Sequence, residues 1–141
     1  MVILDTDHIT LLERVDSPRR TKLLRKLEAS GAATPVVTIV SYEEQVRGWL
    51  GYIAAARSMV EQVTGYKRLL QQLQNYCDWK VLAFDEAAAV ELQALRKCKL
   101  RVGTMDLKIA AITLVHDATL LTGNTSDFQR VPGLKIEDWS R

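Results

Sequence analysis

Short apolar runs alternate with longer segments of helical periodicity along this chain, and this alternation limits its fold more than any other feature. Strands that are covered on both faces of a sheet consist of continuous apolar, often β-branched residues. The runs that fit this description are 2–4, 35–40, 79–84, 119–122 and 134–136. Because helical segments separate them, we expect right-handed crossovers between parallel strands. The sequence therefore predicts an α/β fold with a central, mostly parallel sheet of four to five strands.

Apolar residues recur every three or four positions in the intervening segments, which is the spacing of one helix face. This spacing predicts a helix over 9–15, a second helix through Leu23, Leu24 and Leu27, one or two long helices from Ser41 onward that include 53–76, a helix over 86–98 and a nearly all-apolar helix over 105–116. In the 86–98 helix, the apolar face is expected to contain Ala87, Val90, Ala94 and Cys98.

Composition is that of an ordinary globular protein, with 48% hydrophobic and 26% charged residues. A length of 141 residues suits one core, so we expect a single domain over 1–141. The formal net charge of +2 permits an RNA partner without requiring one. No segment resembles a signal peptide or a membrane span of ~20 apolar residues, which predicts a cytoplasmic protein with no membrane contact. Cys77 and Cys98 are interpreted as buried thiols of a reducing compartment.

Acidic and amide side chains follow the predicted strands, where ligands bind in open parallel sheets. They are Asp5 after the first strand, Glu43 and Glu44 after the second, Asp106 at the start of the apolar helix, and Asn124 and Asp127 after the fourth strand. Because the carboxyl ends of parallel strands share one edge, we expect these side chains to converge.

Helix capping offers a local explanation for several of these residues. Asp7 could cap a helix that begins near His8. Ser41 and Glu44 fit a capping box, and Thr104 could cap the apolar helix with Asp106 in its first turn. Asp5 differs, because a carboxylate at the end of a buried strand costs several kcal/mol unless it is paired, hydrogen-bonded or bound to a metal.

Asp5, Glu44 and Asp106 together would repel one another, and a cation would relieve that repulsion. Oxygen ligands without thiolates or paired histidines favour a hard ion, Mg²⁺ or Mn²⁺. Such an ion can activate water for attack on a phosphodiester. The acidic cluster therefore predicts metal-dependent phosphoryl chemistry.

Four segments together resemble the PIN domain family, specifically its VapC-type ribonuclease toxins: LDTDHI, TIVSYEEQVRG, MDLKIAA and LLTGNTSDFQRVPGL. The resemblance implies a three-layer α/β/α sandwich that hydrolyses RNA, a cognate antitoxin partner and a homodimer. It makes Asp5, Glu44 and Asp106 the metal ligands, with Glu44 chosen over Glu43 because Gly48 follows it by four positions. It places Asn124 at a fourth catalytic position.

Two departures from the family pattern concern the charge of this site. Many relatives have Asp where this chain has Asn124, and Asn where it has Asp7. Asp127 or Asp7 could restore the missing charge, so the number of metal ions stays open. Thr6 and Thr122 are placed to hydrogen-bond carboxylates or bound water.

Outside the acidic cluster, candidate RNA-binding residues are Arg47, Lys97, Lys99 and Arg101, because phosphate binding needs cations. A metal-dependent mechanism requires no histidine, so His8 is given a local structural role. Trp49, Trp79 and Trp139 are interpreted as packing or interface residues rather than as platforms for base stacking.

Two alternative functions remain open on the sequence. The D-x-D pattern also resembles haloacid dehalogenase-type phosphatases, in which Asp5 would be a nucleophile and Asp7 a general acid/base. That reading leaves Glu44 and Asp106 unexplained. The other alternative is a catalytically silent PIN-like module that binds RNA or protein.

Overall fold

The computed structural model describes residues 1–14, 17–32 and 34–141, and these residues form parallel strands. The strands are β1 (Val2–Leu4), β2 (Val36–Thr38), β3 (Lys80–Leu82), β4 (Thr119–Leu121) and β5 (Lys135–Glu137). One ladder has the order β1-β4-β5 and the other joins β2 to β3, with β1 lying beside β2. Every strand pair is parallel, with Ile3 opposite Leu120 and Val37 opposite Val81. The predicted α/β fold with a parallel sheet is confirmed.

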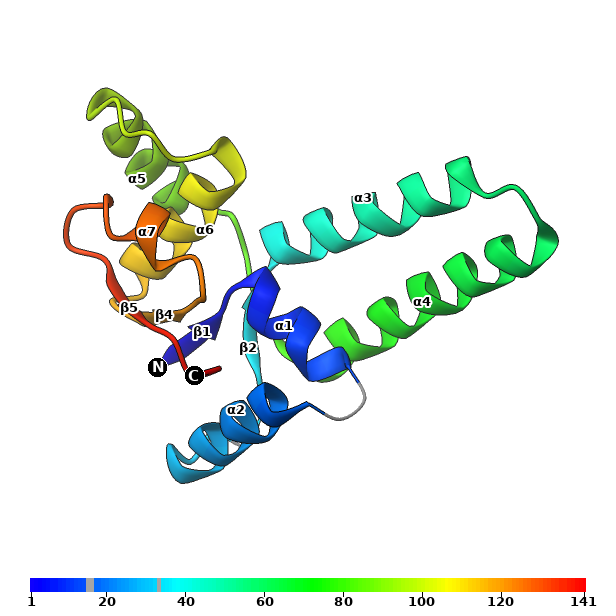
Figure 1. Cartoon of the computed structure of the whole chain (residues 1–141). Coiled ribbons are helices and arrows are strands. Elements are labelled where there is room, and N and C mark those ends of the chain that lie inside the picture. Colours follow the sequence, from blue (N-terminus) through cyan, green and yellow to red (C-terminus); the bar gives the residue numbers. More distant parts are fainter. Residues whose placement is uncertain (15–16, 33) are drawn as a thin grey trace.

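Helices connect the strands as the periodicity predicts. They are α1 (Thr6–Glu13), α2 (Pro18–Ala29), α3 (Ile39–Ala55), α4 (Met59–Asp78), α5 (Glu86–Lys97), α6 (Thr104–Val115) and α7 (Thr125–Phe128). Figure 1 shows α5, α6 and α7 on one side of the strands and α1 and α2 on the other, while α3 and α4 leave the body as an antiparallel pair. Val15, the predicted end of the first helix, lies outside the described residues.

Both faces of the sheet are covered, because neighbouring residues of a strand point in opposite directions. Ile3 and Leu120 belong to a core that includes Ile109 of α6. Leu4 and Leu121, the next residues along, belong to a second core with residues of α1, α2 and α4. These four strand side chains have no exposed surface. This two-sided core explains why the strands lack polar alternation.

The α3–α4 pair depends on one glycine. A Cβ at Gly65 of α4 would collide with Ile53 Cγ1 and lie 3.1 Å from Tyr52 Cδ1, both on α3. Gly65 therefore allows the two helices to approach closely. The outer face of α4 is apolar and exposed, with Met59, Val63, Tyr66, Leu70 and Leu73 all at least 49% accessible.

Two expectations about side-chain burial are wrong. The buried face of α5 contains Ala88, Leu92 and Leu95, whereas Val90 is 67% exposed. Cys77 and Cys98 are both exposed free thiols. Leu92 and Leu95 fill the interior beside α5, and Tyr76 fills it next to Cys77. These larger apolar side chains gain more from burial. Among the described residues, no helix has the length and apolar character needed to cross a bilayer.

Candidate acidic active site

Asp5 is held at the carboxyl end of β1 by donors from both ends of the chain. Its backbone N–H donates to Leu121 O, which continues the β1–β4 ladder by one residue. Its Oδ1 accepts from the Thr6 backbone N–H at 2.8 Å, so Asp5 is the N-cap of α1. Its Oδ2 accepts from Thr122 Oγ1 at 2.8 Å. With only 6% of its surface exposed, Asp5 has each carboxylate oxygen fixed in direction.

Thr6 links Asp5 to Glu44. Its hydroxyl donates to Glu44 Oε1 at 3.1 Å and lies 3.0 Å from Ser41 Oγ. Glu44 is brought here because α3 begins directly after β2, which ends at the same edge as β1. The neighbouring Glu43 instead pairs with Arg47 at 2.6 Å. The two adjacent glutamates therefore face different surroundings, and only Glu44 contacts Thr6.

Asn124 and Asp127 are brought together after β4. Thr122 Oγ1, which donates to Asp5, also accepts from the Asn124 backbone N–H at 3.0 Å. The Asn124 side chain then donates to Asp127 Oδ2 at 3.1 Å. The amide thus orients a carboxylate, and Arg130 lies 3.6 Å from the other oxygen of Asp127.

The carboxylates share one electrostatic environment. Burial, and after it the charges of Asp7 and Asp106, raise the pKa of Asp5 to about 7, against the hydrogen bonds from Thr122 and Thr6 that lower it. Burial also raises the pKa of Glu44, with Asp106 adding to the effect. The pKa of Asp106 is raised by burial and by the charges of Asp127 and Asp7. Negative charge is therefore unfavourable here until a cation compensates it.

The donor set fits a hard, hydrated ion. The candidate ligands at this edge offer carboxylate, amide and hydroxyl oxygens, as Mg²⁺ and Mn²⁺ prefer. Within 1–14, 17–32 and 34–141, no three His, Cys, Asp or Glu side chains are close enough to hold an ion directly. This spacing suits Mg²⁺, which keeps several waters and uses one or two carboxylates.

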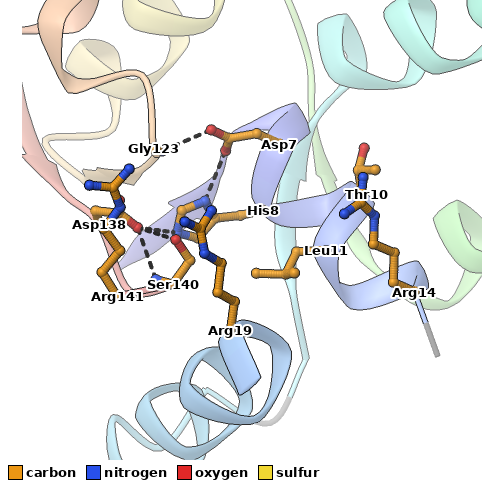
Figure 2. A pocket seen from close by; sticks show the side chains of 10 residues that line it. All are labelled: Asp7, His8, Thr10, Leu11, Arg14, Arg19, Gly123, Asp138, Ser140 and Arg141. Carbon is orange, nitrogen blue, oxygen red and sulfur yellow. Dashed lines mark hydrogen bonds and ion pairs between the residues drawn. The ribbon is translucent and has the colours of Figure 1, made fainter. Parts of the chain in front are cut away.

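Asp7 lies beside this site but is engaged elsewhere (Figure 2). Its Oδ2 accepts from the Gly123 backbone N–H and its Oδ1 from His8 Nδ1, both at 2.8 Å. His8 Nε2 accepts from the Trp139 backbone N–H at 3.3 Å, which places the ring proton on Nδ1. His8 is 1% exposed, in agreement with the structural role expected for it.

A cavity of about 470 Å³ lies next to Asp7 and His8 and is lined in part by Arg14, Arg19 and Arg141. Burial alone would raise the pKa of Asp138 on its wall, but hydrogen bonds from Ser140 and the charge of Arg141 lower it. Asp138 therefore stays ionised and gives this cavity mixed charge.

The capping explanations are wrong. Asp5, not Asp7, caps α1, because the helix begins at Thr6. Thr38 caps α3 by accepting from Ser41 N, so Ser41 and Glu44 form no capping box. Ile39 and Val40 are β-branched and were expected to continue the strand, but they are the first two residues of α3. The helix therefore starts earlier than expected. Thr104 is the first residue of α6 behind Gly103, while Asp106 does lie in the first turn.

The predicted RNA-binding cations are spread over separate elements. Arg47 is on α3, and Lys97 ends α5. Lys99 and Arg101 lie in the loop before α6, where Arg101 O accepts from Arg130 Nη1 at 2.7 Å. Their contact with RNA stays a prediction.

Four polar side chains of α1, α3 and α4 form a group that no sequence pattern predicted: the half-buried Glu13 and the buried Gln45, Gln72 and Tyr76. Its only sequence signal is the position of Gln45 and Gln72 on otherwise amphipathic helices. Polar residues at such positions are usually exposed.

The fold and this site define the class of the protein: a parallel α/β domain with buried carboxylates and hydroxyls at the carboxyl ends of its strands. The sequence model of the PIN domain matches residues 2–134, so the chain belongs to the PIN domain family. The resemblance inferred from the four sequence segments is confirmed. The phosphatase alternative is excluded by this membership, and Asp7 is held by Gly123 and His8.

Individual relatives match over shorter segments. A stretch of 64 residues is 39% identical to the tRNA(fMet)-specific endonuclease VapC of Shigella flexneri, covering 43% of this chain and 48% of that protein. A stretch of 40 residues is 40% identical to ribonuclease VapC2 of Rickettsia felis, covering 28% of this chain and 30% of the relative. The matches thus span less than half the length of these relatives.

Solved structures match over the whole chain. VapBC2 from Rickettsia felis, bound to a promoter DNA fragment, superimposes with a TM-score of 0.73 at 21% identity and 99% coverage of both chains. VapBC-1 from nontypeable Haemophilus influenzae gives a TM-score of 0.73 at 23% identity and 100% coverage of both. These similarities confirm the three-layer PIN-like fold.

Proposed function

We propose that this chain is a metal-dependent endoribonuclease and the toxin of a toxin–antitoxin pair. The observation that carries the proposal is the Asp5 carboxylate, which is buried at a strand end with its pKa raised to about 7 by burial and by neighbouring acids. A fold keeps such an unfavourable group where a cation or a reacting proton compensates it. Membership of the PIN domain family and similarity to VapC ribonucleases support the same reaction.

In this mechanism Asp5, Glu44 and Asp106 would hold a hydrated Mg²⁺ or Mn²⁺ partly through its bound waters, and Asn124 and Asp127 would complete the acidic edge. The bound ion supplies an activated water and compensates charge on the phosphate. Thr6 and Thr122 position the ligands, because their hydroxyls fix Glu44 and Asp5. Asp127 or Asp7 supplies the charge that Asn124 lacks, because the charges of both raise the pKa of Asp106.

The proposed partners are an RNA substrate, a cognate antitoxin and a second copy of the chain, and such a protein would act in the cytoplasm. The solved neighbours are VapBC proteins of toxin–antitoxin systems, which supports the antitoxin. The exposed apolar side chains of α4 form a surface of the kind that another protein covers.

The test compares RNA cleavage by the pure chain in Mn²⁺ with cleavage by Asp5→Asn. We expect Asp5→Asn to lose at least roughly 10- to 100-fold in rate, the loss typical when even a supporting group of a metal site is removed. The matched control is Asp117→Asn, which removes an exposed carboxylate beyond the opposite end of α6 from Asp106.

Equal cleavage by wild type and Asp5→Asn, with EDTA having no effect, would contradict the proposal. Absence of any cleavage in Mn²⁺ or Mg²⁺, together with RNA binding, would leave the catalytically silent module as the function.

A further inference from the structure

A second cavity, of about 400 Å³, opens directly beside Glu44 and Thr6. Its walls come from α1, α3 and α4, and include Gly48, Trp49, Tyr52 and Gln72. The volume lies within the range of roughly 300–1,000 Å³ that small-molecule sites occupy. Glu44 belongs both to this cavity and to the proposed metal site. When the scissile phosphate of an RNA lies at the metal site, the adjacent nucleotide therefore lies beside the cavity.

Gln72 lines this cavity with a hydrogen-bonding capacity that the fold leaves unused. It is 2% exposed, and its Oε1 has no hydrogen-bond partner within the described part of the chain. A buried polar atom without a partner costs roughly 1–3 kcal/mol, and such atoms are rare. This acceptor is therefore a group that a ligand can satisfy.

The direction of the Gln72 amide is set by its neighbours. Tyr76 donates to Gln45 Oε1 at 2.6 Å, and Gln45 Nε2 donates to Glu13 Oε1 at 3.1 Å. The Gln72 side chain also lies close enough to the Glu13 carboxylate to lower the pKa of that group. A carboxylate only accepts, so Gln72 presents its NH₂ to Glu13 and its Oε1 away from it.

The aromatic and charged groups of the cavity indicate which part of a nucleotide it accepts. Trp49 and Tyr52 pack edge to face, with ring centroids 5.5 Å apart, and both line the cavity. The described lining residues include Glu13 and Glu44 but no Lys or Arg, so a phosphate would be repelled. A neutral aromatic base with amino donors suits these walls, because the polar groups that line them are mainly acceptors.

We propose that this cavity binds the base of a nucleotide next to the scissile phosphate, and that Gln72 Oε1 accepts a hydrogen bond from its exocyclic amino group. Adenine, cytosine and guanine carry that group, and uracil lacks it. The inference rests on the proposed ribonuclease function, and it gives Trp49 a ligand contact where a packing role was expected.

The first experiment blocks the cavity without touching the acidic site. Gly48 and Gly51 are exposed residues of α3, and a Cβ at either would meet nothing within 4 Å. Only Gly48 lines the cavity. Gly48→Leu should therefore weaken binding of a single-stranded RNA, whereas Gly51→Leu should not. Losing one stacked base predicts roughly 5- to 150-fold weaker binding, measured by fluorescence anisotropy on an Asp5→Asn background.

The second experiment reads base preference. A randomised single-stranded RNA is cut in Mn²⁺ and the ends are sequenced. Wild type should disfavour uracil at one fixed position beside the cut. Gln72→Leu should lose that preference while still cleaving, and Gln74→Leu, an exposed position on the same helix, should keep it.

The outcomes separate this inference from the proposed function. Cleavage with the same base profile in wild type and Gln72→Leu overturns the inference and leaves the ribonuclease intact. Absence of cleavage by wild type overturns the proposed function. In that case the anisotropy comparison alone tests whether the cavity binds RNA. The Gly48→Leu and Gly51→Leu variants could instead bind RNA equally, while only Gly48→Leu escapes inhibition by a co-expressed antitoxin. That result would assign the cavity to a protein partner and overturn the inference.

Discussion

At the scale of single residues, Thr122 connects the two halves of the acidic site. Its hydroxyl donates to Asp5 Oδ2 and accepts from the Asn124 backbone N–H. One fully buried side chain thereby fixes a proposed ligand and the loop that carries Asn124 and Asp127. The sequence placed Thr122 at a strand end, but neither bond could be assigned without the pairing of β1 with β4.

The raised pKa of Asp5 predicts how stability depends on pH without metal. The folded state holds the Asp5 proton more tightly than the unfolded state does. The protonated carboxyl group therefore makes its full contribution to the free energy of unfolding below about pH 4, and this contribution disappears as the pH rises through about 7. Relative to Asp5→Asn, wild type should lose on the order of 4 kcal/mol of unfolding free energy between those limits.

Urea unfolding in EDTA at pH 4 and pH 8 measures this difference. Asn can replace the acceptor for Thr6, and the Thr122 hydroxyl can rotate to accept from the amide. A constant difference between the two proteins across this pH range would show that Asp5 is ionised in both states.

At the scale of elements, α3 and α4 depend on Gly65 for their close approach. Gly65→Ala should lower stability by about 1–3 kcal/mol, because the added methyl would overlap Ile53 and crowd Tyr52. Gly51→Ala is the matched control: it is also a helical glycine, but it faces open space, and we expect it to stabilise by about 0.5–1 kcal/mol. Thermal and urea unfolding of both variants check this, and equal changes would show that the helices are not in tight contact.

Elements were more predictable than their ends and faces. Strand and helix identity depends on apolar periodicity within one segment, which the sequence contains. The cap of α3 was missed because Ile39 and Val40 extend the β-branched run into the helix. The buried face of α5 was missed because alanines occur on both sides of it, so the packing of Leu92 and Leu95 against α6 decides the rotation.

For the candidate site, too, the sequence predicts which residues gather but not the contacts between them. The acids could be placed at one edge because each follows a strand of a parallel sheet. The bond between Thr6 and Glu44 joins residues 38 positions apart, and that between Gln45 and Tyr76 joins residues 31 apart. Such contacts depend on how the helices pack, and no local pattern encodes them.

At the scale of the whole molecule, a cation should stabilise the fold. At a metal concentration of 100 times Kd, binding adds about 2.7 kcal/mol, which corresponds to a rise in Tm of roughly 5 to 15 °C for a chain of this size. We expect this rise in wild type and in Asp117→Asn, and its loss in Asp5→Asn. Scanning calorimetry with Mg²⁺ and Mn²⁺ measures it, and an unchanged wild-type Tm would contradict the metal site.

The pairing of the first strand with a late one also sets when the acidic edge can assemble during synthesis. Val2–Leu4 lies against Thr119–Leu121, and Asp5 receives its second hydrogen bond from a residue 117 positions later. At a translation rate of about 5–20 residues per second, roughly 6 to 23 s separate the synthesis of Asp5 from that of Thr122. A chain that has not yet reached β4 therefore has its first candidate ligand in place without the strand and the hydroxyl that fix its direction.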